Sequence, residues 1–212
     1  MDGVLFDTTD FHYQAWRDVL AGFDISLSRE KFISTFGMTN EQSLNSMLGY
    51  PPSKTLLEAV EQRKEKNFRR KISGQVRSYP GVFSLLEGLH RSGVRQAIAS
   101  SAPIENIHLL VNEGQIRSYF MAFISGQGFP SKPDPAIFLK ASAQIGVSKH
   151  ACVVIEDSLH GIEAAQRAGM KCIAVATTNS FDSFTGANIT VGRLNELSIS
   201  YILALIQPSK LC

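Results

Sequence analysis

Short apolar runs alternate with amphipathic stretches over the C-terminal half of the chain. The runs RQAIAS, MAFISG, ACVVIED and KCIAVA begin at residues 95, 121, 151 and 171, and helical patterns separate them. Continuous apolar runs of this length between amphipathic helices indicate parallel strands that are buried on both faces. The pattern therefore predicts an α/β fold, in which a Rossmann-like, doubly wound parallel sheet forms the core.

The segment from about residue 11 to 75 has a different pattern, because it holds no strand-like run. Its first stretch, FHYQAWRDVLAGF, places apolar residues on one stripe of a helix. The stretch KTLLEAVEQRKEKNFRRKI predicts a long charged helix, and its inward-facing residues are expected to be Leu56, Leu57, Val60 and Phe68. We expect a small helical lobe here.

The turn sequence YPGV, at residues 79–82, marks the return to the α/β pattern. The predicted domain organisation is therefore an α/β core formed by residues 1–10 and 79–212, with a helical cap formed by residues 11–78 inserted into it. Gly114, Gly146 and Gly169 each follow a helical stretch, where a left-handed residue is expected to end the helix.

The amino-acid composition argues against two classes of binding partner, nucleic acids and membranes. The 21 basic and 19 acidic residues are well mixed and leave a net charge of +2, so no basic stripe suits a nucleic acid. No apolar run of 18 residues and no signal-peptide pattern is present, which excludes a membrane partner and favours the cytoplasm. We expect a monomer or weak homodimer that binds a small molecule.

Three cysteines, Cys152, Cys172 and Cys212, lack the CxxC spacing of a metal or redox site. We expect reduced, buried thiols without a catalytic role.

Polar residues stand at the C-terminal ends of the predicted strands, where open parallel sheets bind their ligands. These residues are Asp2 in the opening turn, Ser100 and Ser101, Lys132, and the adjacent acids Glu156 and Asp157.

Together these groups match the needs of phosphoryl transfer. Adjacent acids at a strand end offer oxygen ligands to Mg²⁺, and Lys132, held before Pro133, offers a point charge for phosphate. Ser100 offers a hydroxyl to the same anion. Taken alone, Asp157 would be a helix N-cap, Lys132 a solvated loop residue and Ser100 a polar strand end. Their combination favours the chemistry.

The chain resembles the haloacid dehalogenase superfamily of phosphohydrolases, in the branch that contains β-phosphoglucomutase and small sugar-phosphate phosphatases. The resemblance extends over essentially the whole length and rests on motifs in a fixed order. They are MDGVLFDTTDFHYQAW (1–16), AIASSAP (97–103), SKPDPAIF (131–138) and VVIEDSLHGIEAAQRAG (153–169).

The resemblance implies a phosphoaspartyl mechanism with Mg²⁺ as the cofactor. Asp2 matches the second Asp of the family's Asp-x-Asp-Gly motif, which is the general acid/base, and it is a candidate metal ligand as well. Ser100 matches the hydroxyl that binds the phosphoryl group, with Ser101 beside it, and Lys132 matches the family's cation. Asp157 matches a Mg²⁺ ligand, with Glu156 next to it.

The residue that matches the family's nucleophile would directly precede Met1, and this chain does not contain it, nor the family's first strand. A start codon placed inside a longer reading frame, a trimmed chain and a catalytically inactive relative are three open explanations. Retention of Asp2, Lys132, Glu156 and Asp157 together favours the first two.

The cap is implied to close over the site and to select the substrate. His12 matches a position that couples cap closure to the acid/base, although a surface or packed histidine is an equal alternative. The substrate loop matches FGMTNEQS, with Gly37, Thr39 and Asn40 as substrate-binding candidates. Mutases of this branch have Lys and Arg where this chain has Phe36 and Asn40.

These observations predict a Mg²⁺-dependent phosphomonoester hydrolase that acts on a small phosphorylated metabolite, most plausibly a sugar phosphate. The alternatives are a hexose-phosphate mutase of the β-phosphoglucomutase kind and an inactive phospho-ligand-binding protein.

Overall fold

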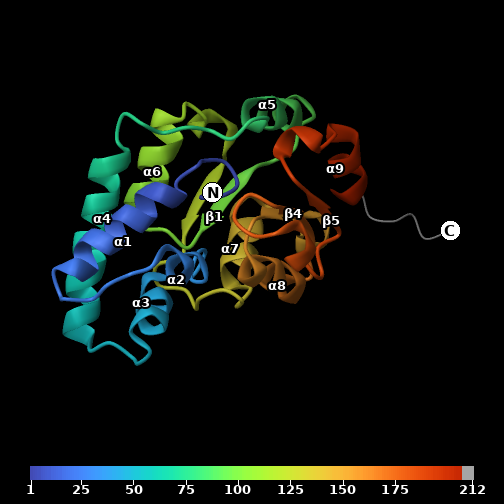
Figure 1. Ribbon diagram of the computed structural model, residues 1–212. Helices are drawn as coiled ribbons and strands as arrows, with labels where there is room; N and C mark the ends of the chain where they lie inside the picture. Colours follow the sequence, from blue (N-terminus) through green and yellow to red (C-terminus); the bar gives the residue numbers. More distant parts are fainter. Residues whose placement is uncertain (207–212) are drawn as a thin grey trace.

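The computed structural model describes residues 1–206, and helices gather on one side of it (Figure 1). The four helices of this lobe are α1 (Thr9–Ala21), α2 (Arg29–Ile33), α3 (Asn40–Leu48) and α4 (Lys54–Ile72). Helix α4 has the predicted bounds because Ser53 caps it, accepting a hydrogen bond from the Leu56 N–H at 3.2 Å. Val60 and Phe68 are fully buried, as predicted.

The rest of the described chain alternates strands with helices. The strands are β1 (Ala97–Ser100), β2 (Ala122–Ser125), β3 (Val153–Glu156), β4 (Lys171–Val175) and β5 (Ile189–Val191). The helices are α5 (Val82–Arg91), α6 (Ile104–Glu113), α7 (Ala136–Gln144), α8 (Leu159–Ala168) and α9 (Ile199–Ile206). Short 3₁₀ turns lie at Arg117–Tyr119, Lys149–Ala151, Phe181–Ser183 and Leu194–Glu196.

All strand pairs are parallel, which confirms the predicted α/β class, but the described strands form two sheets. One sheet is β1–β2 and the other is β3–β4–β5. A cavity of about 210 Å³ is lined by apolar residues of both β1 and β3. The two sheets are therefore separated by a gap that none of the described strands bridges.

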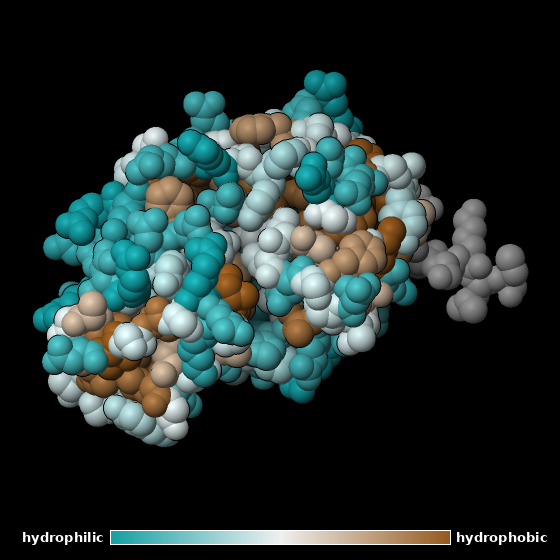
Figure 2. Space-filling view, viewed as in Figure 1, coloured by the Kyte–Doolittle hydropathy of each residue, from teal (hydrophilic) through white to brown (hydrophobic). Residues whose placement is uncertain are grey.

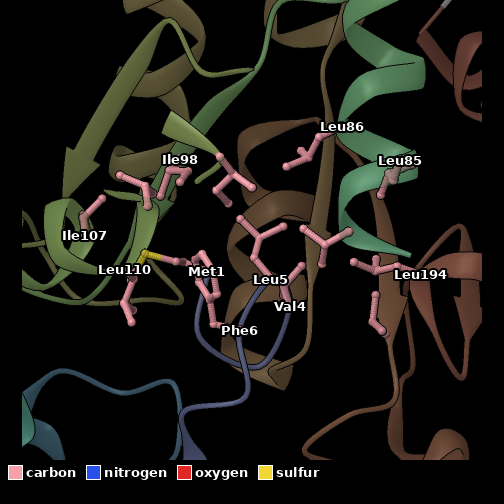
Figure 3. Close-up of a cluster of buried hydrophobic side chains, with 14 of the residues drawn as sticks. Met1, Val4, Leu5, Phe6, Leu85, Leu86, Ile98, Ile107, Leu110 and Leu194 are labelled. Carbon is pink, nitrogen blue, oxygen red and sulfur yellow. The ribbon is translucent and has the colours of Figure 1, made fainter. Parts of the chain in front are cut away.

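The opening loop packs against this gap. Met1, Val4, Leu5 and Phe6 are all buried, and they point into the cluster that contains Ile98 of β1 (Figure 3). The Met1 carbonyl accepts a hydrogen bond from the Leu5 N–H at 2.8 Å, which closes the loop into a tight turn. Burial of a side chain such as Phe6 contributes about 2 kcal/mol. The loop thus fixes the neighbouring Asp2 backbone.

The prediction of a left-handed residue holds at Gly146 and Gly169, with φ of 64° and 72°, but it is wrong at Gly114. Gly114 has φ −73°, and Gln115 takes the left-handed conformation instead, with φ 55°. A Cβ at Gly114 would overlap the Phe6 ring. Close packing against the opening loop, rather than a positive φ, explains this glycine.

The surface of the lobe is mainly hydrophilic along α4, at the left edge of the space-filling view, and hydrophobic residues show where α3 and α4 approach each other (Figure 2). No helix among the described residues is long and apolar enough to span a membrane. Cys172 is buried and Cys152 partly buried, both as free thiols, while Cys212 lies outside the described residues.

Candidate active site

One cavity of about 90 Å³ lies between the helical lobe and the C-terminal ends of β1 and β3. It brings together nearly all of the predicted site residues. They are Asp2, His12, Gly37, Asn40, Ser100, Ser101, Lys132, Glu156 and Asp157. Thr39 does not line it. Its side chain caps α3 and its hydroxyl lies 3.1 Å from that of Ser131.

The Asp2 carboxylate is held by two donors from the start of the lobe. Its Oδ1 accepts hydrogen bonds from the Thr8 hydroxyl at 2.7 Å and from His12 Nε2 at 3.2 Å. Burial opposes ionisation of Asp2, but His12, the Met1 ammonium and Thr8 outweigh it and hold the pKa of this carboxyl well below its ordinary value. Asp2 is therefore an ionised group in a fixed position.

His12 is packed and contacts the acid/base candidate. Its ring stacks on Phe68, with ring centroids 3.8 Å apart and an angle of 5° between the planes. Burial, and then the charge of Lys64, lower the pKa of His12. The imidazole is therefore neutral near pH 7, and its Nε2–H serves as a donor to Asp2.

Lys132 is buried, which excludes the solvated-loop alternative. Its ammonium donates to Glu156 Oε1 at 3.2 Å and lies 4.8 Å from the centroid of the Phe138 ring. Ser100 ends β1 and is also buried, with its hydroxyl accepting a hydrogen bond from the Ala102 N–H at 3.2 Å. A cation and a hydroxyl thus border the same cavity.

The two adjacent acids after β3 have different environments. Glu156 Oε1 also accepts a hydrogen bond from the Ser158 hydroxyl at 2.6 Å, so this oxygen has two donors. Asp157 Oδ2 accepts one from the Thr178 hydroxyl at 2.7 Å. Burial and the neighbouring Glu156 charge raise the pKa of Asp157 to about 7. Burial and Glu156 therefore disfavour the charged form of Asp157, and Lys132 offsets them only in part.

Ser158, rather than Asp157, is the N-cap of α8, since its side chain accepts from the Gly161 N–H at 3.1 Å. The N-cap interpretation of Asp157 is therefore wrong, and its carboxylate is left available for a ligand. Gly3, with φ 70°, lies against that carboxylate, because a Cβ there would overlap it. The Asp2–Gly3 turn thus brings the Asp2 backbone next to Asp157.

The donor set suits Mg²⁺. Asp157 provides a hard carboxylate oxygen and Asp2, whose backbone lies beside it, a main-chain carbonyl oxygen, and a bound cation would stabilise the ionised form of Asp157. Among the described residues no group of three or more His, Cys, Asp or Glu side chains forms a complete metal cluster.

The lobe is closed onto the core over this cavity. The Ser101 hydroxyl donates to the Gly37 carbonyl at 3.3 Å, and a Cβ at Gly37 would lie 2.8 Å from the Ser158 Cβ. Only a glycine, with its φ of 86°, permits this approach. The substrate-loop prediction is thereby given a geometric basis, although its role in binding stays a prediction.

Sequence reasoning missed several side chains of the site. Thr178 follows β4 and would have been found by the strand-end rule that selected Asp157. Lys64 and Glu65 line the cavity from α4 and are both buried. Lys64 lies four residues after Val60 and four before Phe68, so the helical period itself places it on the buried face.

Known proteins share this arrangement of sequence and fold. The family model for haloacid dehalogenase-like hydrolases matches residues 1–175. The chain is 29% identical to β-phosphoglucomutase of Bacillus subtilis (strain 168) over 210 residues, which cover 95% of this chain and 91% of that protein. It is 28% identical to hexitol phosphatase B of Escherichia coli O157:H7, over 96% of this chain and 94% of that one.

The fold also matches a solved relative. The crystal structure of β-phosphoglucomutase from Clostridium difficile superposes with a TM-score of 0.86 at 26% identity, over 97% of this chain and 93% of the other. Since the family model covers the opening motif, the lobe and the first four strands, the chain belongs to the haloacid dehalogenase-like hydrolases, in the β-phosphoglucomutase-like branch.

Proposed function

We propose that the protein is a Mg²⁺-dependent phosphomonoester hydrolase whose substrate is a small sugar phosphate and whose helical cap, residues 11–78, encloses that substrate. The observation that supports this most directly is the convergence of Ser100, Lys132, Asp2 and Asp157 on one cavity beneath the lobe. A hydroxyl, a buried cation and two carboxylates are the groups that phosphoryl transfer requires.

In this proposal Ser100, at the end of β1, and Lys132, in the loop between β2 and α7, hold the phosphoryl oxygens, because both border the cavity from the core. Asp2, oriented by Thr8 and His12, takes up a proton when the bound phosphoryl group raises the pKa of its carboxyl, gives that proton to the departing substrate oxygen and later takes one from water. Asp2 and Asp157 would hold Mg²⁺, which when bound neutralises phosphoryl charge. Glu156 acts on this site through Lys132, which it contacts.

We further propose that the nucleophile is an aspartate joined to the Met1 amino group, at the end of an extended apolar strand. Its carboxylate would attack phosphorus and release the substrate alcohol, and water would then cleave the aspartyl phosphate. Two features support this. The gap between the two sheets is lined by residues of both β1 and β3, and Met1 borders both that gap and the site cavity. Such a strand would pair with β1 and β3.

The relatives' names support a sugar-phosphate substrate, since one is a β-phosphoglucomutase and another a hexitol phosphatase. Hydrolysis is favoured over mutase activity by the cap. Phe36 and Asn40 occupy the positions where mutases of the branch have cations, and the Asn40 amide donates to Glu65 at 2.8 Å. The similarity to β-phosphoglucomutase over most of the chain makes a hexose-phosphate mutase the second candidate.

A direct test compares the native protein, its intact mass measured from its source, with variants of the residue before Met1. We expect Mg²⁺-dependent hydrolysis of p-nitrophenyl phosphate and of a hexitol phosphate when that residue is Asp, and a loss of about 10³-fold or more when it is Asn. Absence of hydrolysis with Asp in place would favour the non-catalytic binder. A requirement for a bisphosphate activator would favour the mutase.

A further inference from the structure

A second buried lysine borders the cavity, and it belongs to the lobe, whereas Lys132 belongs to the core. Lys64 of α4 is 4% exposed, and its Nζ donates to Glu65 Oε1 at 2.7 Å. The same Nζ lies 5.4 Å from the centroid of the Trp16 ring and 5.8 Å from that of Phe68. Both members of the pair line the cavity. The lobe therefore presents a desolvated ion pair to whatever the cavity holds.

Hydrogen bonds from two other elements hold Glu65 in place. Its Oε1 also accepts from the Asn40 amide at 2.8 Å, and its Oε2 accepts from the Asn106 amide at 2.6 Å. Asn106 belongs to α6 of the core and is fully buried, and its own oxygen accepts from Arg69 at 2.8 Å. Glu65 thus links α4 and α3 of the lobe to the core.

The lobe residues and the core residues that line the cavity differ in net charge. Lys64 and Glu65 cancel each other at the lobe end, while Asp2, Glu156 and Asp157 outnumber Lys132 at the core end. Lys64 has three N–H donors, of which one is used by Glu65 among the described residues. The pair can therefore donate to a hydroxyl through Lys64 and accept from one through Glu65.

We propose that the Lys64–Glu65 pair determines specificity for the leaving group, selecting an uncharged polyhydroxyl group over one that bears a second phosphate. This rests on the proposed phosphatase function, because it assumes that the phosphoryl group occupies the core end. A second phosphate at the lobe end would meet a lysine that Glu65 already neutralises, and it would be repelled by Glu65 itself. Glu65 acts as a positioning residue for Lys64.

The test measures ligand affinity by titration calorimetry in Mg²⁺, with the 212-residue chain and three probes. Inorganic phosphate reports the core end alone, sorbitol 6-phosphate adds a polyol, and glucose 1,6-bisphosphate adds a second phosphate. K64M is compared with K66M, which removes the same charge from an exposed position of α4. E65Q is compared with E58Q, also exposed on α4.

We expect K64M to lower the affinity for sorbitol 6-phosphate by about 10- to 100-fold and the affinity for inorganic phosphate by less than about threefold. The affinities of K66M should equal those of the wild type. In E65Q, the affinity for glucose 1,6-bisphosphate should rise about tenfold relative to the affinity for sorbitol 6-phosphate, and this rise should be smaller at high salt. E58Q should show no such gain. If Glu65 had only a structural role, E65Q would lower the affinities for all three probes together.

Equal affinity ratios in K64M and K66M would overturn the inference while leaving the phosphatase proposal intact. Failure of every probe, inorganic phosphate included, would overturn both. Where a single variant does not fold, K64M/E65M replaces it, because removing both members of a buried ion pair leaves no uncompensated charge. That double variant should fold and show the same loss for sorbitol 6-phosphate. Retention of the wild-type ratio would count against the proposal.

Discussion

The two buried Lys–Glu pairs on either side of the cavity differ in their surroundings. Lys64–Glu65 in the lobe is short, at 2.7 Å, and amide donors from Asn40 and Asn106 complete it. Lys132–Glu156 in the core is longer, at 3.2 Å, and lies beside the buried charge of Asp157. The lobe pair, whose two charges balance, is suited to a neutral group, while the core pair, which has the further acid Asp157 beside it, is suited to a cation and an anion together.

The largest expected effect breaks the core pair. Lys132→Met removes the cation that lies at the phosphoryl end of the cavity. We expect hydrolysis of p-nitrophenyl phosphate by the protein that has its nucleophile to fall by about 10²- to 10³-fold, as when one electrostatic stabiliser of a transition state is lost. Steady-state kinetics at saturating Mg²⁺ measure this.

Lys149→Met is the matched control for that variant, because Lys149 is exposed and lies outside the cavity. A Lys132→Met protein as active as Lys149→Met would contradict the role proposed for the core pair. Circular dichroism confirms that both variants are folded before their rates are compared.

The next largest expected effect is the pH dependence of stability that the Lys64–Glu65 pair of the lobe produces. Burial opposes ionisation of Glu65, but Lys64 and the hydrogen-bond donors outweigh it and lower its pKa from 4.5 to about 2. Because the folded-state pKa is the lower one, this carboxylate stabilises the fold above pH 4.5 and loses that contribution as pH falls towards 2. The contribution is up to about 3 kcal/mol.

Urea unfolding of the wild type and of E65Q, at pH values from 7 to 3, measures this contribution of Glu65 to the free energy of unfolding. The gap in unfolding free energy between the two should be widest at neutral pH and should narrow below about pH 4.5. A constant gap across this range would show that Glu65 is not ionised in the fold. E58Q, whose side chain is exposed, should show no pH-dependent gap.

The core and the lobe also differ in how far sequence alone predicts them. Helix α4 was predicted residue for residue because its apolar period is a local signal, and the structure adds the Ser53 cap at its start. Ser100, Lys132 and Asp157 were found because the ends of parallel strands meet at one edge, so a topological rule sufficed. These signals do not depend on side-chain packing.

Long-range packing explains what was missed. Lys64 and Glu65 are polar residues in a charged helix, and nothing local shows that Asn106, 41 residues after Glu65, completes their hydrogen bonds. Gly114 is a second example, because the absence of a side chain there makes room for the Phe6 ring and is not needed to end α6. The division of the strands into two sheets depends likewise on which edges meet in space.

A smaller effect tests the incomplete charge balance of the core. Asp157→Asn removes a buried carboxylate whose charged form burial and Glu156 disfavour, so thermal stability in EDTA should not fall. Mg²⁺ should stabilise the wild type by about 1 to 3 kcal/mol at 10 to 100 times its dissociation constant and should leave the variant unchanged. Equal Mg²⁺ stabilisation of both proteins would remove Asp157 from the metal site.

The smallest effect compares one helix cap from each region. Ser53 caps α4 in the lobe and is exposed, whereas Ser158 caps α8 and also donates to Glu156 at 2.6 Å. Ser53→Ala should cost about 1 kcal/mol of unfolding free energy, the usual value for an N-cap. Ser158→Ala should cost about 1 kcal/mol more, because it also withdraws a donor from a buried carboxylate. Equal losses in urea unfolding would mean that the Ser158 hydroxyl adds nothing to the stabilisation of Glu156 beyond what Lys132 supplies, and the comparison of the two caps would then report helix capping alone.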